Sequence, residues 1–536
     1  MIKRKPFWLA VIAILLFGAV LAAGDGGSAW LQGWLAFSLL LGISALILYA
    51  TWRVVIGSKM ERSLLMAVTA AFMLRLCLGA ALTQLLPVIG YADSQEHQGG
   101  YVFTDAYVRD RQAWELANTG APLTTAFSGQ YSGDQYGGML GLEALLYRTL
   151  SLDYHRQTLV LTLTAAAAAW GVIFLWKASQ AWFGRSVAGA AAWILALYPE
   201  STLLGSSQMR EAFVISALVL TFYSLSQLPT TSRSGKSSFA WLGWFALALV
   251  ILGLFQPLLA LVALGITFLL WLLDASHRRQ PRSLAVGLLF VFLLIVALLV
   301  VASILASLPS LQGSGTLGIF GDWLVHNFNF QAYLAERASG MVQKLIDTLG
   351  EGWTWLIVMV YGIAQPVLPA VVGDPTAAPV MRWMGFFRAL GWYALAPFLV
   401  YGLLAAFRAR DERRRFQLIF LGLAIWVWAI IAAFNGGADQ WDTPRYRTLL
   451  LAFQALLAAW ALVWARRHQD AWLSRWLAVE AVFVGMFTEW YISRYFPGWP
   501  HLDIFTMIFV TLLLSFSILL GGWLYDRRKR TTSKRI

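Results

Sequence analysis

The most charged stretch in the first half of this apolar chain is YVFTDAYVRDRQAWELA, residues 101–117. Two aspartates and two arginines lie between Asp105 and Arg111. A carboxylate can accept a proton from an attacking hydroxyl group, and a guanidinium can bind a phosphate through two parallel hydrogen bonds. Acids beside arginines are therefore suited to a reaction in which a phosphate leaves and its growing charge is stabilised.

This stretch predicts a helix that begins near Thr104 and ends before Gly120. Thr104 is a suitable N-cap residue, and Asp105 would then lie at the positive end of the helix dipole. Helical spacing gives one face that carries Tyr107, Asp110 and Trp114. The plainest alternative is that Asp105 is only a capping residue and that Asp110 is only solvated.

Further charges lie at the ends of other apolar runs. Glu200 is expected in a short outer turn, and the adjacent Arg210 and Glu211 come where the next helix is expected to begin. The late loop DQWDTPRYRTLLLAF supplies three more candidates: Arg445, Tyr446 and Arg447. Charged groups cost about 2.5–3.5 kcal/mol each at the bilayer centre, so they are functional candidates by default. For the two arginines of the late loop, snorkelling to the membrane interface is the competing interpretation.

The elements that must position these residues are membrane-spanning helices. The chain of 536 residues is 59% hydrophobic and 12% charged, whereas about a quarter of the residues of an average soluble protein are charged. Runs of about 20 apolar residues, the length of a spanning helix, recur throughout. They are too long and too uniformly apolar for barrel strands. The predicted fold class is therefore an all-α polytopic membrane protein.

About fourteen spans are predicted. Their apolar runs begin near Phe7, Trp30, Leu64, Thr158, Val187, Met209, Ala240, Pro257, Leu284, Phe386, Phe416, Leu449, Trp476 and Ile504. Arg75 lies within the third run, where it is expected to lie near a helix end or to pair with a neighbour. The run from Ala240 to Leu273 must fold as two spans hinged near Gln256 and Pro257. The run at 353–372 is expected not to span, because it contains two prolines and would break the alternation of the loops.

Most lysines and arginines lie in the loops that alternate to one side, such as residues 53–62, residues 408–415 and the tail from Arg527. Cytoplasmic loops are enriched in these residues, so this side is predicted to be cytoplasmic. The distribution explains the net charge of +13 without a nucleic-acid partner. The sequence has no Asn-x-Ser/Thr acceptor site, which favours a bacterial inner membrane, and its single cysteine, Cys77, excludes an intrachain disulfide.

Two large segments are then predicted outside, at residues 90–156 and 307–382. The first is the one acidic region of a basic protein, with acids at Asp93, Glu96, Asp105, Asp110, Glu115, Asp134, Glu143 and Asp153. Lipid-borne phosphates would lie at the depth of these segments. A sugar donor would therefore come from the bilayer.

At these residues the sequence resembles the integral-membrane glycosyltransferases of the C-type fold, which include polyprenyl-phosphate-sugar mannosyltransferases and lipid A aminoarabinose transferases. The similar segments are LRLCLGAAL, FTDAYVRDRQAWELANTG, YPESTLLGSSQMREAF and TPRYRTLLLAF. The resemblance is best from Leu64 to Leu273. It departs from the family in two extra N-terminal spans and in an Asp-x-x-x-x-Asp pair where the family has adjacent Asp-Glu.

The resemblance implies roles for individual residues. Asp105 would be the catalytic carboxylate, with Asp110 as its helper and Asp93 as the rival base. Substrate-binding roles would fall to Arg109, Arg210, Glu211, Arg445, Tyr446 and Arg447. The reaction would be an inverting displacement at the anomeric carbon of a sugar carried by a polyprenyl phosphate, with a glycan, lipid or protein as the acceptor. No cofactor is assigned, and the use of a divalent metal is left open.

Four parts follow from this interpretation. Residues 1–63 form the two extra spans, and residues 64–304 form a glycosyltransferase-like core that contains the outer loop 90–156. Residues 305–385 form a second outer segment with re-entrant or surface helices. Residues 386–536 form a C-terminal bundle with a basic cytoplasmic tail.

Two other functions fit parts of the sequence. An O-antigen polymerase or ligase also has many spans and a large outer loop, but its chemistry is expected in a late loop with arginine and histidine, where this chain has only His326. A lipid-glycan flippase or transporter commonly contains internal repeats, and none is evident here.

Overall fold

The structure is a computed structural model that describes residues 4–27, 29–228, 240–275, 283–306, 318, 321–322, 325, 340–367, 377–495 and 498–533. Every regular element within these residues is a helix, as the predicted fold class requires. The chain divides into two units. The N-terminal unit comprises Met1–Trp323 with Leu449–Ala455, and the C-terminal unit comprises Leu324–Thr448 with Leu456–Ile536.

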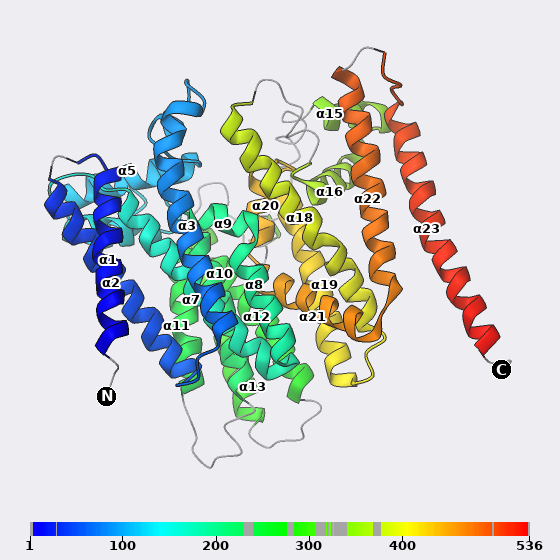
Figure 1. The fold of residues 1–536 in the computed structure, drawn as a ribbon, viewed down its shortest axis with the longest axis horizontal. Coiled ribbons are helices and arrows are strands. Elements are labelled where there is room, and N and C mark those ends of the chain that lie inside the picture. The colour runs from blue at the N-terminus through cyan, green and yellow to red at the C-terminus, as the bar shows by residue number, and fades with distance from the viewer. Residues whose placement is uncertain are drawn as a thin grey trace. The chain divides into compact units, whose positions relative to one another are not determined.

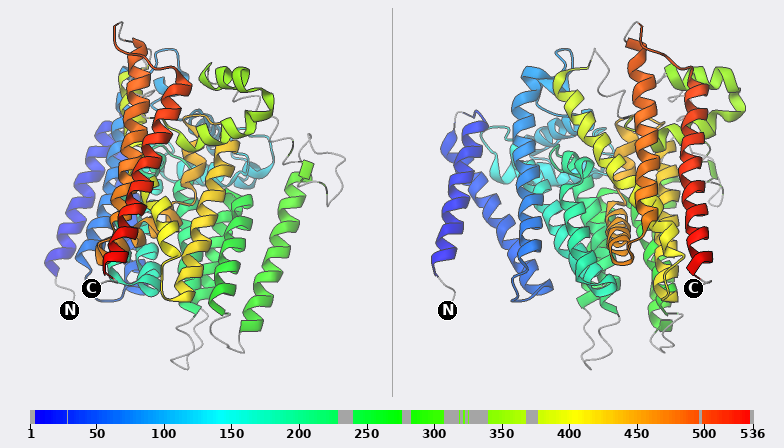
Figure 2. Two further views of the ribbon diagram at one scale, coloured as in Figure 1. Left: turned by 90° about the vertical axis from the view of Figure 1, so that its right-hand side faces the viewer. Right: turned by 45° about the vertical axis from the view of Figure 1, so that its right-hand side comes forward.

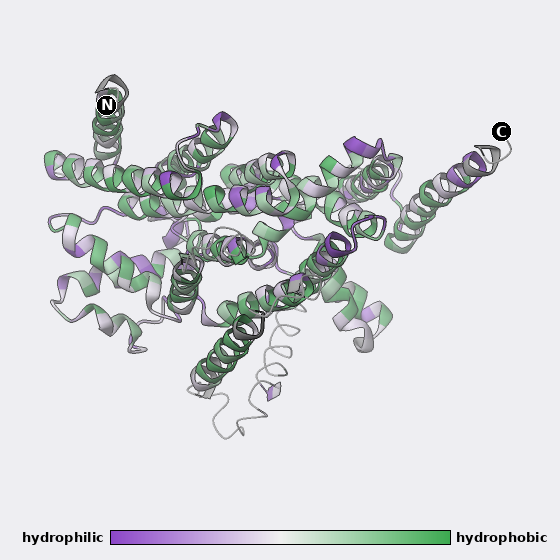
Figure 3. Cartoon of the chain, turned by 90° about the horizontal axis from the view of Figure 1, so that it is seen from below, coloured by the Kyte–Doolittle hydropathy of each residue, from purple (hydrophilic) through white to green (hydrophobic). Residues whose placement is uncertain are grey.

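Each of the fourteen predicted apolar runs contains a helix. These helices are α1 (Arg4–Gly24), α2 (Trp30–Val55), α3 (Arg62–Ile89), α7 (Thr158–Phe183), α8 (Arg185–Leu197), α10 (Glu211–Gln227), α11 (Ala240–Phe255), α12 (Pro257–Ala275), α13 (Ser283–Ala306), α18 (Pro379–Ala406), α19 (Glu412–Asn435), α21 (Leu451–His468), α22 (Ala471–Ile492) and α23 (Ile504–Ser533). Hydrophobic residues dominate the long helices (Figure 3).

The count of fourteen spans is not confirmed. Among the described residues, seven helices are long and apolar enough to cross a membrane, or nine if each bent pair of helices is one span. Several of the other helices are too short by themselves: α8 has 13 residues and α11 has 16, whereas a span needs about 20. Apolar composition marked these helices correctly, but it did not give their lengths. The chain remains a multi-pass membrane protein.

In the N-terminal unit, α7 is the central helix. It packs against α2, α3, α8 and α10, and 78% of its apolar window is buried inside the protein. The helices α1, α2 and α3 run alternately up and down beside it (Figure 1). The short helices of residues 90–156 gather at the end opposite the chain's N-terminus, as the views in Figure 1 and Figure 2 agree. They are α4 (Gln95–Gln98), α5 (Thr104–Asn118), η1 (Leu123–Phe127) and α6 (Gly138–Leu150).

A bend of 53° separates α8 from α9 (Pro199–Gly205). Pro199 disfavours helical geometry in the residue before it, and Tyr198 accordingly has an extended ψ of 119°. The bend frees backbone carbonyls of α8, and Arg75 of α3 binds them. Its guanidinium donates to the carbonyls of Leu195 and Ala196 at 3.2 and 2.8 Å. The buried arginine noticed in the sequence is therefore a partner of the broken helix.

The C-terminal unit contains the short helices α15 (Gly340–Leu349), η4 (Glu351–Trp353), α16 (Thr354–Ala364), α20 (Asp442–Thr448) and η5 (Ser493–Tyr495), besides α18, α19, α22 and α23. The 11 residues of α16 are about half of what a span needs, which agrees with the expectation that the run at 353–372 does not cross. Residues 368–372 of that run, the loops 233–236 and 278–282, and His326 lie outside the described residues.

Candidate functional site

The charged stretch of the outer loop forms the helix predicted for it, and α5 begins at Thr104. The predicted cap is wrong. Phe103, with extended backbone, occupies the N-cap position, and no side chain caps the helix there. The Thr104 hydroxyl instead donates to Glu96 at 3.2 Å. Helix α5 is therefore held mainly by what its side chains bind on α6 and on the turn before α10.

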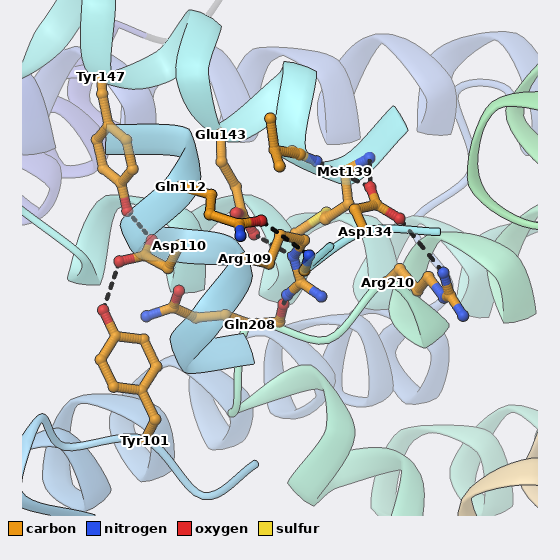
Figure 4. A network of polar contacts seen from close by, with 12 residues as sticks. Tyr101, Arg109, Asp110, Gln112, Asp134, Met139, Glu143, Tyr147, Gln208 and Arg210 are labelled. Atoms are coloured by element: carbon orange, nitrogen blue, oxygen red, sulfur yellow. Dashed lines mark hydrogen bonds and ion pairs between the residues drawn. The ribbon is translucent and has the colours of Figure 1, made fainter. Parts of the chain in front are cut away.

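Two acidic residues of α5 differ in their environments. Asp105 is exposed in the first turn of the helix, at its N-terminal end. Asp110 is 0% exposed and faces residues of α6 and of the loop around it (Figure 4). The alternative that Asp110 is merely solvated is wrong, because its partners lie 9 to 45 residues away in the sequence and their approach could not be read from the helix alone.

Asp110 is surrounded by donors. The hydroxyls of Tyr101 and Tyr147 donate to its two oxygens, and Nε2 of His155 lies 2.7 Å from Oδ2. The His155 ring stacks on Trp114 with 4.9 Å between centroids. Burial acts to raise the pKa of Asp110, but the charge of His155 and the hydrogen bonds to the carboxylate outweigh it and lower that pKa. An ionised carboxylate thus joins α5 to α6 and to the loop that precedes α7.

Arg109 binds on another side of the same helix. Its Nε lies 3.0 Å from Oε1 of Glu143 on α6, and its Nη2 donates to the carbonyl of Gln208. Gln208 has a φ of 58°, a left-handed conformation that is uncommon for a residue other than glycine. Burial acts to lower the pKa of Arg109, but the charges of Glu143 and Asp134 raise it. Arg109 therefore fixes a strained turn immediately before α10.

Arg210 follows this turn and is partly accessible. Its Nη1 lies 3.4 Å from Oδ1 of Asp134, and its side chain is 15% exposed. The guanidinium lies over the ring of Tyr136, 5.1 Å from the centroid. Within the described residues its Nε is buried without a hydrogen-bond partner. It is the exposed part of the guanidinium, and not this buried Nε, that is accessible to an added anion.

Asp134 also binds the beginning of α6, and this contact fixes its position. Its Oδ2 accepts hydrogen bonds from the backbone amides of Met139 and Leu140, at 2.9 and 3.0 Å. These are the free amides at the beginning of α6, where a carboxylate is favoured by the helix dipole. The carboxylate is therefore fixed by backbone and presents its other oxygen to Arg210.

Three of the predicted site residues come together in the N-terminal unit: Arg109, Arg210 and Glu211. Glu211 is buried in the first turn of α10, and its charge contributes to raising the pKa of Arg109. Asp105 and Arg109 lie one turn apart on the same side of this helix, and Asp110 lies on another face. The site is thus built around α5, with one exposed carboxylate and a buried network behind it.

The late triplet lies in α20, in the C-terminal unit. Arg447 is 1% exposed and donates to the carbonyls of Ile363 and Gln365 at 3.0 and 2.8 Å. Its guanidinium lies 3.5 Å from the ring centroid of Trp392. Arg445 is buried and has an Nη1 3.7 Å from Asp442, and the carbonyl of Tyr446 accepts from a tryptophan of α19. Snorkelling is therefore wrong for both arginines, since neither extends into solvent.

Sequence reasoning missed several residues of the network: Tyr101, Asp134, Glu143, Tyr147 and His155. All five lie in the acidic loop 90–156, and Asp134 and Glu143 are among its acids, but their role depends on contacts across residues 101–211. One of these residues, Asp134, could have been found from the sequence. Asp134 comes shortly before a glycine-led apolar helix, which is typical of a residue that caps a helix. Nothing comparable marked the tyrosines or His155.

A metal site is not formed by the usual ligands in the described part of the chain. No group of three or more histidine, cysteine, aspartate or glutamate side chains is placed there to hold a metal ion.

Comparisons with known proteins give distant structural likeness only. No protein-family model matches the sequence, and no curated protein sequence matches it. The archaeal oligosaccharyltransferase AglB from Archaeoglobus fulgidus, in complex with an inhibitory peptide and a dolichol-phosphate, is similar with a TM-score of 0.37 and 12% identity. The Archaeoglobus fulgidus oligosaccharyltransferase in its apo form is similar with a TM-score of 0.39 and 14% identity. In both cases the similarity covers 85% of this chain and 55% of the other.

Proposed function

We propose that this protein is a membrane glycosyltransferase that moves a sugar from a polyprenyl-phosphate donor to a glycan, lipid or protein acceptor outside the cytoplasm. The proposal depends on how α5 is held and on which of its acids is exposed. Its first turn presents an exposed carboxylate, Asp105, while Arg109 and Asp110 fix the helix to α6 and to the turn before Arg210. An exposed carboxylate and a partly accessible arginine within one unit suit proton abstraction coupled to departure of a phosphate.

In the proposed reaction Asp105 accepts the proton of the acceptor hydroxyl group. The hydroxyl oxygen attacks the anomeric carbon from the face opposite the phosphate, so a carbon–oxygen bond forms as the sugar–phosphate bond breaks. The configuration of the sugar is inverted. The polyprenyl phosphate leaves with the bonding electron pair, and Arg210 is the residue of the N-terminal unit that would bind its charge.

The other predicted residues receive roles that fit their surroundings. Asp110 would be the helper of Asp105 by position, because its oxygens are occupied by Tyr101, Tyr147 and His155. Arg109 and Glu211 would shape the turn that carries Arg210. Arg445, Tyr446 and Arg447 of the C-terminal unit would keep the substrate-binding roles that the resemblance implies, although Arg447 also donates to two backbone carbonyls.

The test is transfer of a radiolabelled sugar from a polyprenyl phosphate in proteoliposomes. Replacement Asp105→Asn should lower the transfer rate by about 10²–10⁴-fold, because loss of a general base typically costs that much. The matched control is Glu115→Gln, which removes another exposed carboxylate from the same helix and should leave the rate unchanged. Undiminished transfer by Asp105→Asn would refute the assignment, and loss of transfer in Asp93→Asn alone would assign the base to Asp93.

A further inference from the structure

An apolar cleft lies between the N-terminal helices of the N-terminal unit, away from the residues proposed for glycosyl transfer. It has a volume of about 550 Å³ and is formed by α1, α2 and α3, with one residue from α7. Its wall is almost entirely apolar and includes Phe17, Leu41, Leu48, Leu65, Phe72 and Met73. In a membrane protein such a cleft is a suitable site for a hydrocarbon chain, because it offers no hydrogen-bonding groups that would need water.

A second hollow of about 460 Å³ adjoins the cleft, and Met60 lines both. This hollow is more polar than the cleft, and we call it the polar hollow; its charged lining residues are Glu61, Arg62 and Arg185. It is formed where α3 and α8 begin. The guanidinium of Arg185 forms an ion pair with Glu61, so Arg62 leaves the hollow with a net positive charge. The basic residues Arg53 and Lys59 are also exposed close by in the sequence.

The cleft and the hollow meet at the depth expected for lipid headgroups. Tyr49 and Trp52 line the apolar cleft near the end of α2, and Trp176 lines the polar hollow. Such amphipathic rings are enriched at the membrane–water interface. Helix α2 ends and α3 begins at the end of the unit opposite α5 (Figure 1). This is the end that the basic loops predict to be cytoplasmic, where anionic lipids attract basic residues.

We propose that these two spaces form one binding site for an anionic glycerophospholipid. One acyl chain occupies the apolar cleft, and the phosphodiester binds Arg62 and Arg185 in the polar hollow. Charge selects the lipid, because a zwitterionic headgroup would bring a cationic group toward two arginines. Bound there, the lipid packs between α1, α2 and α3 and attaches the two N-terminal helices to the rest of the unit.

The experiment is native mass spectrometry of the full chain in detergent after removal of lipid. Phosphatidylglycerol and phosphatidylcholine of equal chain length are added separately, and the bound lipid is counted. Phosphatidylglycerol should be retained about thirtyfold more strongly, as expected for two basic contacts near the membrane surface. Equal retention of the two lipids would overturn the proposal.

Substitutions separate the two halves of the site. Ala45→Trp places a large ring in the apolar cleft, which Ala45 lines, and should abolish tight retention. The matched control is Ala50→Trp, at an exposed position of the same helix that is not among the lining residues. The double replacement Arg62→Glu with Arg185→Glu should remove the preference for phosphatidylglycerol, and Arg410→Glu, on an exposed arginine of another basic loop, should not.

A change at Glu61 should increase lipid retention, whereas the preceding substitutions should decrease it. Because this carboxylate competes for Arg185, Glu61→Gln should increase retention of phosphatidylglycerol. Retention that is unchanged by Ala45→Trp, or lowered by Glu61→Gln, would overturn the proposal. So would displacement of phosphatidylglycerol by an equimolar polyprenyl phosphate, since the site would then belong to a different lipid. None of these outcomes depends on whether Asp105 acts in glycosyl transfer.

Discussion

At the scale of single residues, exposure separates the two aspartates of α5. Both were visible in the sequence as acids near arginines, and both were predicted to lie on one outer helix. Only the structure distinguishes the exposed Asp105 from Asp110, whose oxygens bind Tyr101, Tyr147 and His155. A buried carboxylate with three partners is costly to disturb, because removal of its charge leaves donors unsatisfied.

Replacement Asp110→Asn should lower the thermal unfolding midpoint of the purified protein at pH 7. The pKa of Asp110 is lowered in the folded state. Its charge therefore contributes stability that is fully present above the unfolded pKa of about 4 and is lost as the pH falls through the lower folded value. The difference between the variant and the natural protein should shrink as the pH falls below about 4. Thermal unfolding measured across that range checks this.

The control for this prediction is Glu115→Gln, an exposed acid on the same helix. It should unfold like the natural protein at each pH. A difference between Asp110→Asn and the natural protein that stays constant with pH would show that the asparagine acts through its shape and not through the missing charge.

At the scale of elements, the decisive feature is the broken helix α8–α9. Proline at position 199 predicts a break, and the sequence placed charged residues beside it. The sequence did not show that Arg75, more than 100 residues earlier, would donate hydrogen bonds to the carbonyls that the bend leaves free. The same guanidinium reaches Ser201 at 3.0 Å. The planar fork of arginine can serve several acceptors at fixed angles, whereas lysine offers one ammonium group.

Replacement Arg75→Lys should therefore destabilise the bend. We expect a loss of about 1.5–3 kcal/mol in the free energy of unfolding, the usual value of hydrogen bonds to a charged group, together with faster hydrogen exchange of the α9 amides. Arg62→Lys, at the exposed beginning of the same helix α3, should change neither quantity. If the α9 amides of Arg75→Lys exchange hydrogen at the same rates as in the natural protein, other contacts hold the bend.

At the scale of the whole molecule, the prediction that matters is which side of the membrane carries α5. The basic loops predict that α5 lies outside the cytoplasm. In the N-terminal unit, α5 and the beginning of α3 lie at opposite ends (Figure 2). The side of the membrane on which α5 lies decides whether Asp105 can meet an acceptor outside the cell.

The single cysteine makes this test direct. In a Cys77→Ser background, Gln130→Cys should react with a membrane-impermeant maleimide in intact cells, because residue 130 belongs to the outer loop. Ser58→Cys, in the basic connection between α2 and α3, should react only after the membrane is permeabilised. Both positions are exposed. The reverse pattern would place Asp105 in the cytoplasm and contradict the proposed reaction.

The sequence by itself determined the all-helical class, the location of fourteen apolar helices and the helix that carries Asp105. These features depend on local composition and spacing, because a helix satisfies its own backbone and a bilayer selects for apolar length. The tertiary structure alone decided that several of these helices are too short to span, that Asp110 is enclosed by Tyr101, Tyr147 and His155, and that Arg447 binds the end of α16. Each of these features depends on where separate segments end or meet, which the period of one segment does not specify.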